Sequence, residues 1–405
     1  MSGLKKIVIV SGNRIAPATT GGQVHSLSIA RALVRSGHSV QIFSVTGRRE
    51  DYGLRNVIHG YIEQPNIEPG LSEEISVGLF YGVLQTVGRR LNFPRVWQHA
   101  LMRRGLVPKR LRSALQSADV ILSDFPYVPR FDGPWRNKPW FLISHNLEYK
   151  LLEQGGGWYA RYTQWMRDIE SSAPGTFTDI LACAEEDRDF YRQHDKGGRL
   201  ALPIVRCGVD PRAYVTTEAM RQSVRAQFNL EEADTVLMFS GSGYPPNVDA
   251  YEEIRRFCQA EAEYLARARV HFMVVGSVCP QPSRNGALIV TGRVPEVLPY
   301  FAAADAGLNM VRRGSGSNVK IFEYLAARLP VISTVFGARG TPLQSEEDYL
   351  PVGTDDLKQV IERFLGQDRR LWRQKAEGVW TRHGRACDIQ HLVEDAVRGL
   401  PGFTD

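Results

Sequence analysis

The sequence lacks closely spaced cysteine pairs and long hydrophobic runs. Its five cysteines, an odd number, never come within a C-x-x-C spacing. This spacing favours reduced, mostly buried thiols in a cytosolic protein, and it predicts neither a zinc site nor a redox site. No apolar stretch approaches the roughly 20 residues that cross a bilayer, and the short run after two N-terminal lysines does not resemble a signal peptide. We therefore expect no membrane-spanning segment.

Acidic residues are absent from residues 75–118, in a chain whose formal net charge is +6. Within this segment the apolar spacing over residues 93–101 predicts a helix that Pro94 opens. Two interpretations stay open: a helix packed on the core with a solvated basic face, or a helix that meets an anionic membrane surface. No helix-turn-helix, zinc-finger or RNP signature indicates nucleic acid. The arginines that would face the acceptor side or the membrane are Arg89, Arg90, Arg103 and Arg104.

What the sequence contains is a repeated alternation of short β-branched runs with amphipathic stretches. It predicts strands at 5–12, 39–45, 118–124 and 140–146, with a helix at 24–36. After a break at 201–214 it predicts strands at 235–243, 269–277, 286–294 and 306–311, with helices at 247–260, 297–304 and about 318–328. This alternation is typical of α/β domains built on parallel sheets. We expect two such domains, 1–203 and 204–385, and a C-terminal helix within 386–405.

Glycine and polar residues follow the predicted strands, where ligands bind to open parallel sheets. Gly21 and Gly22 leave backbone N–H groups bare at the start of the first helix, as in an anion site. Glycines that only permit a turn are the alternative. The stretch SGNRIA after the first strand does not read G-x-G-x-x-G, which disfavours a nicotinamide cofactor.

Residues 291–340 carry the most specific pattern, TGRVPEVLPYFAAADAGLNMVRRGSGSNVKIFEYLAARLPVISTVFGARG. Gly314 and Gly316 let the backbone approach a pyrophosphate, and Lys320 adds a positive charge. Glu323, one turn later, is placed to accept hydrogen bonds from ribose hydroxyls, since a carboxylate among apolar neighbours needs a partner. The stretch resembles the donor-binding half of GT-B glycosyltransferases of the family 4 type.

Four other segments are similar to the same family, in the same order. They read GGQVHSLSIARALVRSGHSV, FLISHNLEY, VRCGVDPRAY and FSGSGYPPNVDAYEEI. The resemblance covers about residues 1–50, 118–150 and 200–345. No single segment is specific, but their order along the chain supports the family as a whole.

The resemblance implies two Rossmann-like α/β domains that face each other across a cleft. It implies retaining transfer of a sugar from a UDP- or GDP-type donor to a hydroxyl, without a metal ion or other cofactor. The N-terminal domain would hold the acceptor, and the C-terminal helix would cross back to it. The residues that the resemblance assigns to the donor are Gly22, Gly241, Ser242, Gly276, Arg293, Val294, Gly314, Ser315, Gly316, Ser317, Asn318, Lys320 and Glu323.

Three residues are assigned to catalysis, and two of them have alternative interpretations. Lys320 would stabilise the leaving diphosphate. His145 would bond a donor hydroxyl or phosphate, or would be a structural histidine. Asp124 stands where many relatives carry a histidine; it would orient the acceptor or act as a base, or would cap the turn before Pro126.

The pattern also departs from the family where Ser315 replaces the first glutamate of the usual E-x7-E spacing. This departure, together with Asp124, keeps open a catalytically silent partner subunit that binds nucleotide sugar or glycan. A second rival is a GT-B nucleotide-sugar epimerase, which needs no acceptor. We expect a transferase that acts on a glycan or lipid-linked glycan in cell-surface polysaccharide or glycolipid synthesis. Its expected place is the cytoplasm, peripherally on the inner membrane face.

Overall fold

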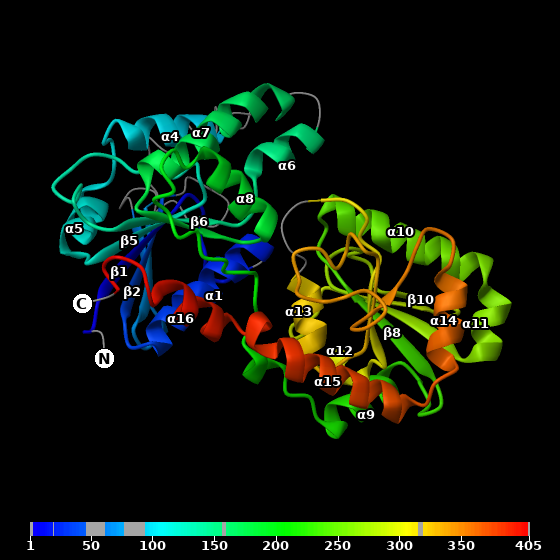
Figure 1. The fold of residues 1–405 in the computed structure, drawn as a ribbon. Coiled ribbons are helices and arrows are strands. Elements are labelled where there is room, and N and C mark those ends of the chain that lie inside the picture. Colours follow the sequence, from blue (N-terminus) through cyan, green and yellow to red (C-terminus); the bar gives the residue numbers. More distant parts are fainter. Residues whose placement is uncertain are drawn as a thin grey trace. The chain divides into compact units, whose positions relative to one another are not determined.

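A computed structural model describes residues 3–18, 20–45, 61–76, 94–155, 159–314 and 319–403. The chain divides into two compact units, coloured along the sequence in Figure 1. The N-terminal unit comprises Met1–Cys207 and Ile389–Asp405, and the C-terminal unit comprises Gly208–Asp388. The boundaries expected from the sequence, 203/204 and 385/386, lie a few residues earlier in the chain.

The N-terminal unit is built on a seven-stranded sheet in the order β3-β4-β2-β1-β5-β6-β7. Its strands are β1 (Lys6–Ser11), β2 (Ser39–Val45), β3 (Tyr61–Glu68), β4 (Leu71–Ser76), β5 (Val120–Asp124), β6 (Trp140–Ser144) and β7 (Asp179–Ala182). All neighbouring strands run parallel except β3, which pairs antiparallel with β4. The α/β class expected from the sequence is confirmed.

Both faces of this sheet are buried, as the alternation along β1 shows. Ile7 and Ile9 belong to one apolar cluster, whereas Val8 and Val10 belong to another. The helices of the unit are α1 (Gly21–Arg35), α4 (Pro94–Arg103), α5 (Lys109–Ser117), α6 (Glu148–Gly155), α7 (Thr163–Thr176), α8 (Glu185–His194) and α16 (Ile389–Val397). Burial on both faces explains why these strands are short apolar runs.

Helix α1 begins and ends where its sequence dictates. Thr20 caps it and forms a capping box with Gln23, and Gly37 with a φ of +92° follows its end. Its apolar face packs against α16, and Gln390 of α16 donates to the carbonyl of Ala32 at 3.2 Å.

The hairpin β3–β4 was not expected, because polar residues interrupt its hydrophobic pattern. Glu73 of β4 is nevertheless buried, and its carboxylate accepts hydrogen bonds from the backbone N–H groups of Ile15 and Ala16 at 2.7 and 2.8 Å. It also accepts from Ser44 at 2.6 Å. A buried carboxylate that holds the loop after β1 fills an inward position that sequence patterns assign to an apolar residue.

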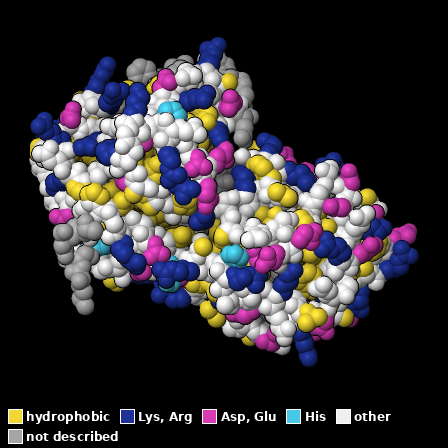
Figure 2. All heavy atoms as spheres, viewed as in Figure 1, with side chains coloured by type: hydrophobic (Ala, Val, Ile, Leu, Met, Phe, Trp, Pro, Cys, Tyr) yellow, Lys and Arg dark blue, Asp and Glu magenta, His cyan; other side chains and the backbone are white. Residues whose placement is uncertain are grey.

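The basic segment is described only in part. Helix α4 begins at Pro94, as predicted, and its last turn places Met102 in the core. Arg103 and Arg104 are exposed, and Figure 2 shows Lys and Arg side chains over this part of the unit. The described part of α4 therefore packs on the core with arginines at its end. No helix of the described residues is both long and apolar enough to cross a bilayer.

The C-terminal unit repeats the architecture, with strand order β10-β11-β9-β8-β12-β13-β14. Its strands are β8 (Thr235–Ser240), β9 (Val270–Val275), β10 (Ser283–Asn285), β11 (Leu288–Gly292), β12 (Ala306–Asn309), β13 (Val331–Ser333) and β14 (Leu350–Pro351). Only β10 is antiparallel to its neighbour among these described strands. The helices are α9 (Glu218–Gln227), α10 (Pro245–Ala260), α11 (Ala262–Ala268), α12 (Leu298–Ala303), α13 (Val319–Ala326), α14 (Leu357–Leu365) and α15 (Arg369–Cys387).

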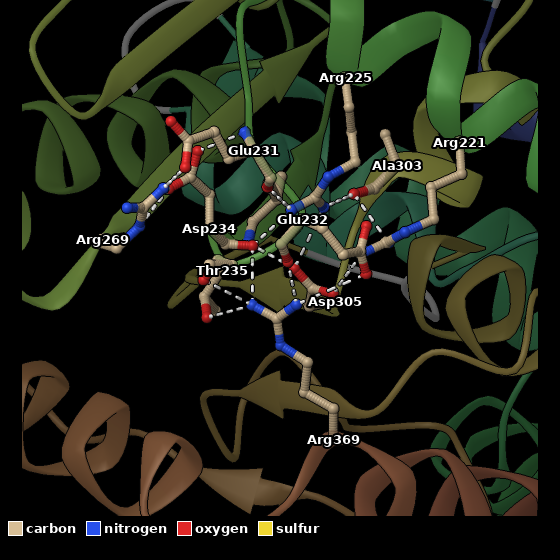
Figure 3. A network of polar contacts seen from close by, with 12 residues as sticks. Arg221, Arg225, Glu231, Glu232, Asp234, Thr235, Arg269, Ala303, Asp305 and Arg369 are labelled. Carbon is tan, nitrogen blue, oxygen red and sulfur yellow. Dashed lines mark hydrogen bonds and ion pairs between the residues drawn. The ribbon is translucent and has the colours of Figure 1, made fainter.

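A buried ionic network joins α9 to the amino ends of β8 and β12 (Figure 3). Arg221 and Arg225 of α9 contact the carboxylate of Asp305 at 3.1 and 3.4 Å. Asp305 also accepts the backbone N–H of Val236 at 2.8 Å. All three charged side chains are about 4% exposed. The network ties the start of β8 to the helix that precedes it in sequence.

Candidate active site

Polar side chains gather at the carboxyl ends of β1, β5 and β6 in the N-terminal unit, around Asp124. One carboxylate oxygen of Asp124 accepts from Ser11 at 2.6 Å, and the other accepts from Ser26 at 2.6 Å. His145 Nε2 lies 2.7 Å from the same oxygen that Ser26 contacts. Asp124 is 1% exposed and His145 is 4% exposed. The carboxylate thus orients the histidine and the two hydroxyls.

The His145 ring is held at both nitrogens. Its Nε2 contacts Asp124, and its Nδ1 lies 2.9 Å from Nδ1 of His25. Burial lowers the pKa of His25 well below its ordinary value, and the charge on His145 lowers it further. Because both ring nitrogens of His145 have partners inside the unit, bonding to a ligand would require one of these contacts to be exchanged.

Phe125 covers this cluster in a strained conformation. Its φ of +75° is unusual for a bulky residue, and strain of this kind is stored at functional sites. The ring lies 4.2 Å from the His145 ring between centroids. A Cβ added to Gly22 would lie 2.9 Å from the Phe125 ring, so glycine is required at the start of α1 for this packing. The predicted site residue Gly22 is therefore placed beside Asp124 and His145.

In the C-terminal unit, glycines bring three loops together at the carboxyl ends of β8, β9 and β11. A Cβ on Gly276, whose φ is +112°, would lie 2.4 Å from the carbonyl oxygen of Gly241. Gly241 N in turn donates to the carbonyl of Val275 at 3.0 Å. Gly292, with a φ of +66°, closes β11. This packing keeps the loops close to the sheet edge, with Ser242 following Gly241 directly.

Lys320 reaches the same edge from the first turn of α13. Its ammonium donates to Asn247 Oδ1 at 2.8 Å and lies 4.9 Å from the centre of the Phe239 ring. Asn247 in turn donates to the carbonyl of Ser242 at 3.2 Å. The side chain is 8% exposed, and burial lowers the pKa of Lys320 to about 8, although the charge of Glu323 opposes this shift. Among the described residues, Glu323 is the charged group that acts on this ammonium, and Asn247 is its hydrogen-bond partner.

Glu323 has a partner, as the sequence argument required. The hydroxyl of Tyr214 donates to its Oε1 at 2.9 Å. Burial raises the pKa of Glu323, whereas the Tyr214 hydrogen bond and the Lys320 charge lower it. Among the described residues this is the hydrogen bond found to the carboxylate, so its other oxygen can accept from a further donor.

The arginines of the predicted donor site differ in their availability. Arg313 pairs with Asp249 at 2.5 Å and Arg312 pairs with Glu253 at 2.8 Å, so both are engaged within the unit. Arg293 is exposed and has no polar partner among the residues that the structure describes. Val294 beside it is partly buried against the core. Arg293 is thus the arginine of this set that is open to an anion.

The remaining predicted site residues are Gly314, which the structure describes, and others that lie outside the described residues. Gly314 is described, with a φ of +126° and a would-be Cβ 3.4 Å from Pro246. Ser315, Gly316, Ser317 and Asn318 lie outside the described residues, as do Arg89 and Arg90.

The sequence did not single out four residues that the structure adds to the two clusters. These are Ser11, Ser26, Tyr214 and Asn247. Ser11 ends β1, and Ser26, Asn247 and Tyr214 stand within the motifs already quoted, so their positions carried a signal. The residue type of Ser26 carried none, because a serine within an amphipathic helix is ordinarily solvated or bonded to its own backbone.

Comparison with known proteins supports the same family. Residues 234–366 match the family model described as glycosyl transferases group 1. No curated protein matches the sequence.

Solved structures of similar fold span nearly the whole chain. A sucrose-phosphate synthase from Thermosynechococcus elongatus superposes with a TM-score of 0.65 at 15% identity, covering 97% of this chain and 98% of that one. HepE from Anabaena, solved with UDP and glucose, gives 0.63 at 13% identity, covering 97% and 98%. WaaG, a glycosyltransferase involved in lipopolysaccharide biosynthesis, gives 0.62 at 17% identity, covering 98% and 100%.

These identities establish the fold alone, and the family model covers residues 234–366 within the C-terminal unit. The chain thus has the GT-B fold of two Rossmann-like α/β units, and the match of residues 234–366 to the glycosyl transferases group 1 model supports a transferase.

Proposed function

We propose that the protein is a retaining glycosyltransferase that moves a sugar from a UDP- or GDP-type donor to a hydroxyl of a glycan or lipid-linked glycan. The observation that carries this proposal is the buried Lys320 ammonium, held by Asn247 beside the glycine loops of the group 1 domain. HepE, one of the similar structures, is described with UDP and glucose. A nucleotide sugar is therefore the ligand class that this edge of the sheet suits best.

Lys320 and the backbone would stabilise the leaving diphosphate. Negative charge grows on the diphosphate as its bond to the sugar breaks, and a buried cation stabilises that charge more than one in water does. Backbone N–H groups of residues 241–243 and of the loop after Gly314 would add donors, and Arg293 would supply a second cation. We propose that these groups suffice for transfer without a metal ion.

Glu323 would hold the ribose. The hydroxyl of Tyr214 donates to one oxygen of Glu323 at 2.9 Å. This bond fixes the orientation of the carboxylate and so the direction in which its other oxygen accepts. Two hydrogen bonds from a ribose would select nucleotide donors over free sugar phosphates, since a site built for hydroxyls rejects ligands that lack them.

The cluster around Asp124 would serve the acceptor. Asp124 is buried and bonded to three side chains, so its role would be to position His145. A ring nitrogen of His145 would then exchange its present partner for a hydroxyl or phosphate of the ligand. The similarity to WaaG, described as acting in lipopolysaccharide biosynthesis, supports a cell-surface glycan or glycolipid acceptor at the cytoplasmic membrane face. The exposed Arg103 and Arg104 of the basic segment suit an anionic surface.

A thermal-shift screen with UDP-, GDP-, ADP- and dTDP-sugars in chelator-treated buffer tests the donor. A ligand at about 100 times its dissociation constant stabilises the fold by about 2.7 kcal/mol. Glu323→Gln should remove this shift for the responding donor and leave the midpoint without ligand nearly unchanged. A purely structural Glu323 would give the reverse, a lower midpoint with the ligand shift intact.

Activity then separates the rival functions. A transferase releases nucleoside diphosphate only when an acceptor is present. Release without an acceptor, together with free altered sugar, would identify an epimerase. Donor binding without release under any acceptor would identify a silent partner subunit, and it would overturn the proposal.

A further inference from the structure

Three buried side chains of the N-terminal unit converge behind His145, outside the site proposed above. Cys183 directly follows β7, Cys207 is the last residue of the first segment of the unit, and His25 belongs to α1. One ligand atom of each lies within 4.8 Å of those of the other two. The two sulfur atoms are 3.4 Å apart. The exposed fractions are 1% for His25, 0% for Cys183 and 7% for Cys207.

The free nitrogen of His25 is the second observation at this place. Its Nδ1 is engaged with His145, and its buried Nε2 has no partner at good hydrogen-bond geometry among the described residues, although the backbone of Val205 and Arg206 faces the ring. Buried polar atoms nearly always have a partner, so an orphaned imidazole nitrogen beside two thiols needs an explanation.

The His25 ring is placed so that this nitrogen can serve as a ligand. His25 Nδ1 lies 2.9 Å from Nδ1 of His145, and His145 Nε2 lies 2.7 Å from the Asp124 carboxylate. In the tautomer in which Nδ1 of His25 carries the proton, Nε2 has a lone pair for a metal ion.

The spacing of the three atoms suits a thiophilic cation. With Zn–S bonds of about 2.3 Å and Zn–N bonds of about 2.0 Å, tetrahedral ligands lie roughly 3.5 to 3.8 Å apart. The sulfur atoms, 3.4 Å apart, are close to that spacing and much farther apart than the roughly 2.05 Å of a disulfide. Two thiolates and one imidazole are also a donor set that soft and borderline cations prefer.

We propose that Cys183, Cys207 and His25 bind one thiophilic metal cation in the N-terminal unit. Binding displaces the two thiol protons to solvent, and the Nε2 lone pair of His25 completes the set. The site is separate from the donor-binding edge of the other unit and takes no part in bond making. Because a ligating histidine donates its other N–H to a partner, the cation would fix the His25 to His145 contact and so the orientation of the ring beside Asp124.

Titration of the full-length protein with Co²⁺ and Zn²⁺ tests the site. The protein is first freed of metal with a chelator under a thiol reductant. Co²⁺ should give a thiolate-to-metal charge-transfer absorption that saturates at one equivalent per chain, and one equivalent of Zn²⁺ should abolish it. Cys183→Ser and Cys207→Ser should each lose the band. Cys279→Ser, which alters the partly exposed cysteine of the other unit, should keep it.

The opposite results overturn the proposal. Wild-type protein that shows no thiolate band and retains no Zn²⁺ has no such site, whatever the variants do. A band that Cys279→Ser removes would place the metal at the exposed thiol. A Cys183–Cys207 disulfide, seen by mass spectrometry as the loss of two hydrogen atoms in protein purified without reductant, combined with absent metal binding, would show a redox pair instead. Each of these outcomes leaves the donor screen unaffected.

Discussion

At the scale of single residues, Lys320 is the side chain whose protonation should be visible in function. Burial lowers its pKa to about 8. A bound diphosphate favours the charged form, so donor binding raises this pKa. Below pH 8 the free protein already carries the ammonium, so donor affinity does not depend on pH. Above pH 8 binding must take up a proton, so affinity falls by up to about tenfold per pH unit.

We expect nucleotide-sugar affinity, measured by calorimetry, to decline through this range in wild-type protein. Lys320→Met should bind more weakly at every pH and show no decline, since it has no proton to gain. Lys320→Arg should keep its affinity across the range, because the guanidinium stays charged. A wild-type profile that is flat to one unit above the pKa, or a decline that persists in Lys320→Met, would show that Lys320 does not contact the diphosphate.

Single residues also show how much of the candidate site could be predicted from the sequence. Lys320 and Glu323 were identified from a motif, and the structure supplies Asn247 and Tyr214 as their partners. The neighbours of Asp124 come from positions 113 and 98 residues away in the chain. Such contacts depend on strand order and register, which no local pattern encodes. Cys183 and Cys207, 24 positions apart, meet in the same way, so their spacing gave no sign of a shared site.

At the scale of elements, the network around Asp305 should decide whether α9 stays attached to its sheet. Asp305→Asn keeps the volume but leaves Arg221 and Arg225 buried beside a neutral group, and breaking a buried ion pair in this way costs about 3 kcal/mol or more. The matched control is Glu232→Gln, which removes a carboxylate that contacts Arg221 but is 75% exposed. An exposed pair contributes about 1 kcal/mol or less.

Urea denaturation followed by far-ultraviolet circular dichroism compares the two variants. We expect a large loss of unfolding free energy for Asp305→Asn and a small one for Glu232→Gln. Equal effects would mean that burial does not set the strength of this network.

The elements themselves followed the sequence closely for most strands with two buried faces, although the fully buried β7 was not predicted. The continuous apolar runs of β1, β5 and β8 were predicted, since parallel strands covered on two sides leave no room for alternation. The hairpin β3–β4 was missed because Glu73 occupies a buried position there. The antiparallel β10 was missed as well, since its three residues are all exposed. Short polar strands at the edge of a sheet form because they pair with a neighbouring strand. The hydrophobic periodicity of their own sequence gives no sign of that pairing.

At the scale of the whole molecule, the two units differ in how the chain builds them. The C-terminal unit is one continuous segment, Gly208–Asp388, whereas the N-terminal unit needs a second segment, Ile389–Asp405. That segment contributes Ile389, Val393, Leu400 and Phe403 to the apolar cluster on the α1 face of the sheet. A chain that stops at Cys207 would expose this face to water, at roughly 25 cal/mol for each Å² uncovered.

We therefore expect residues 208–388 alone to unfold cooperatively and to bind the donor found in the screen. Residues 1–207 alone should aggregate or melt well below the full chain, and a peptide of residues 389–405 should raise their melting temperature in a concentration-dependent way. Val393→Asp in the peptide places a charge against that cluster, so it should abolish the rescue. A stable 1–207 fragment whose melting temperature does not change with the peptide would show that α16 is dispensable for the fold of the N-terminal unit. Donor binding that requires both fragments would place part of the nucleotide site outside the group 1 domain.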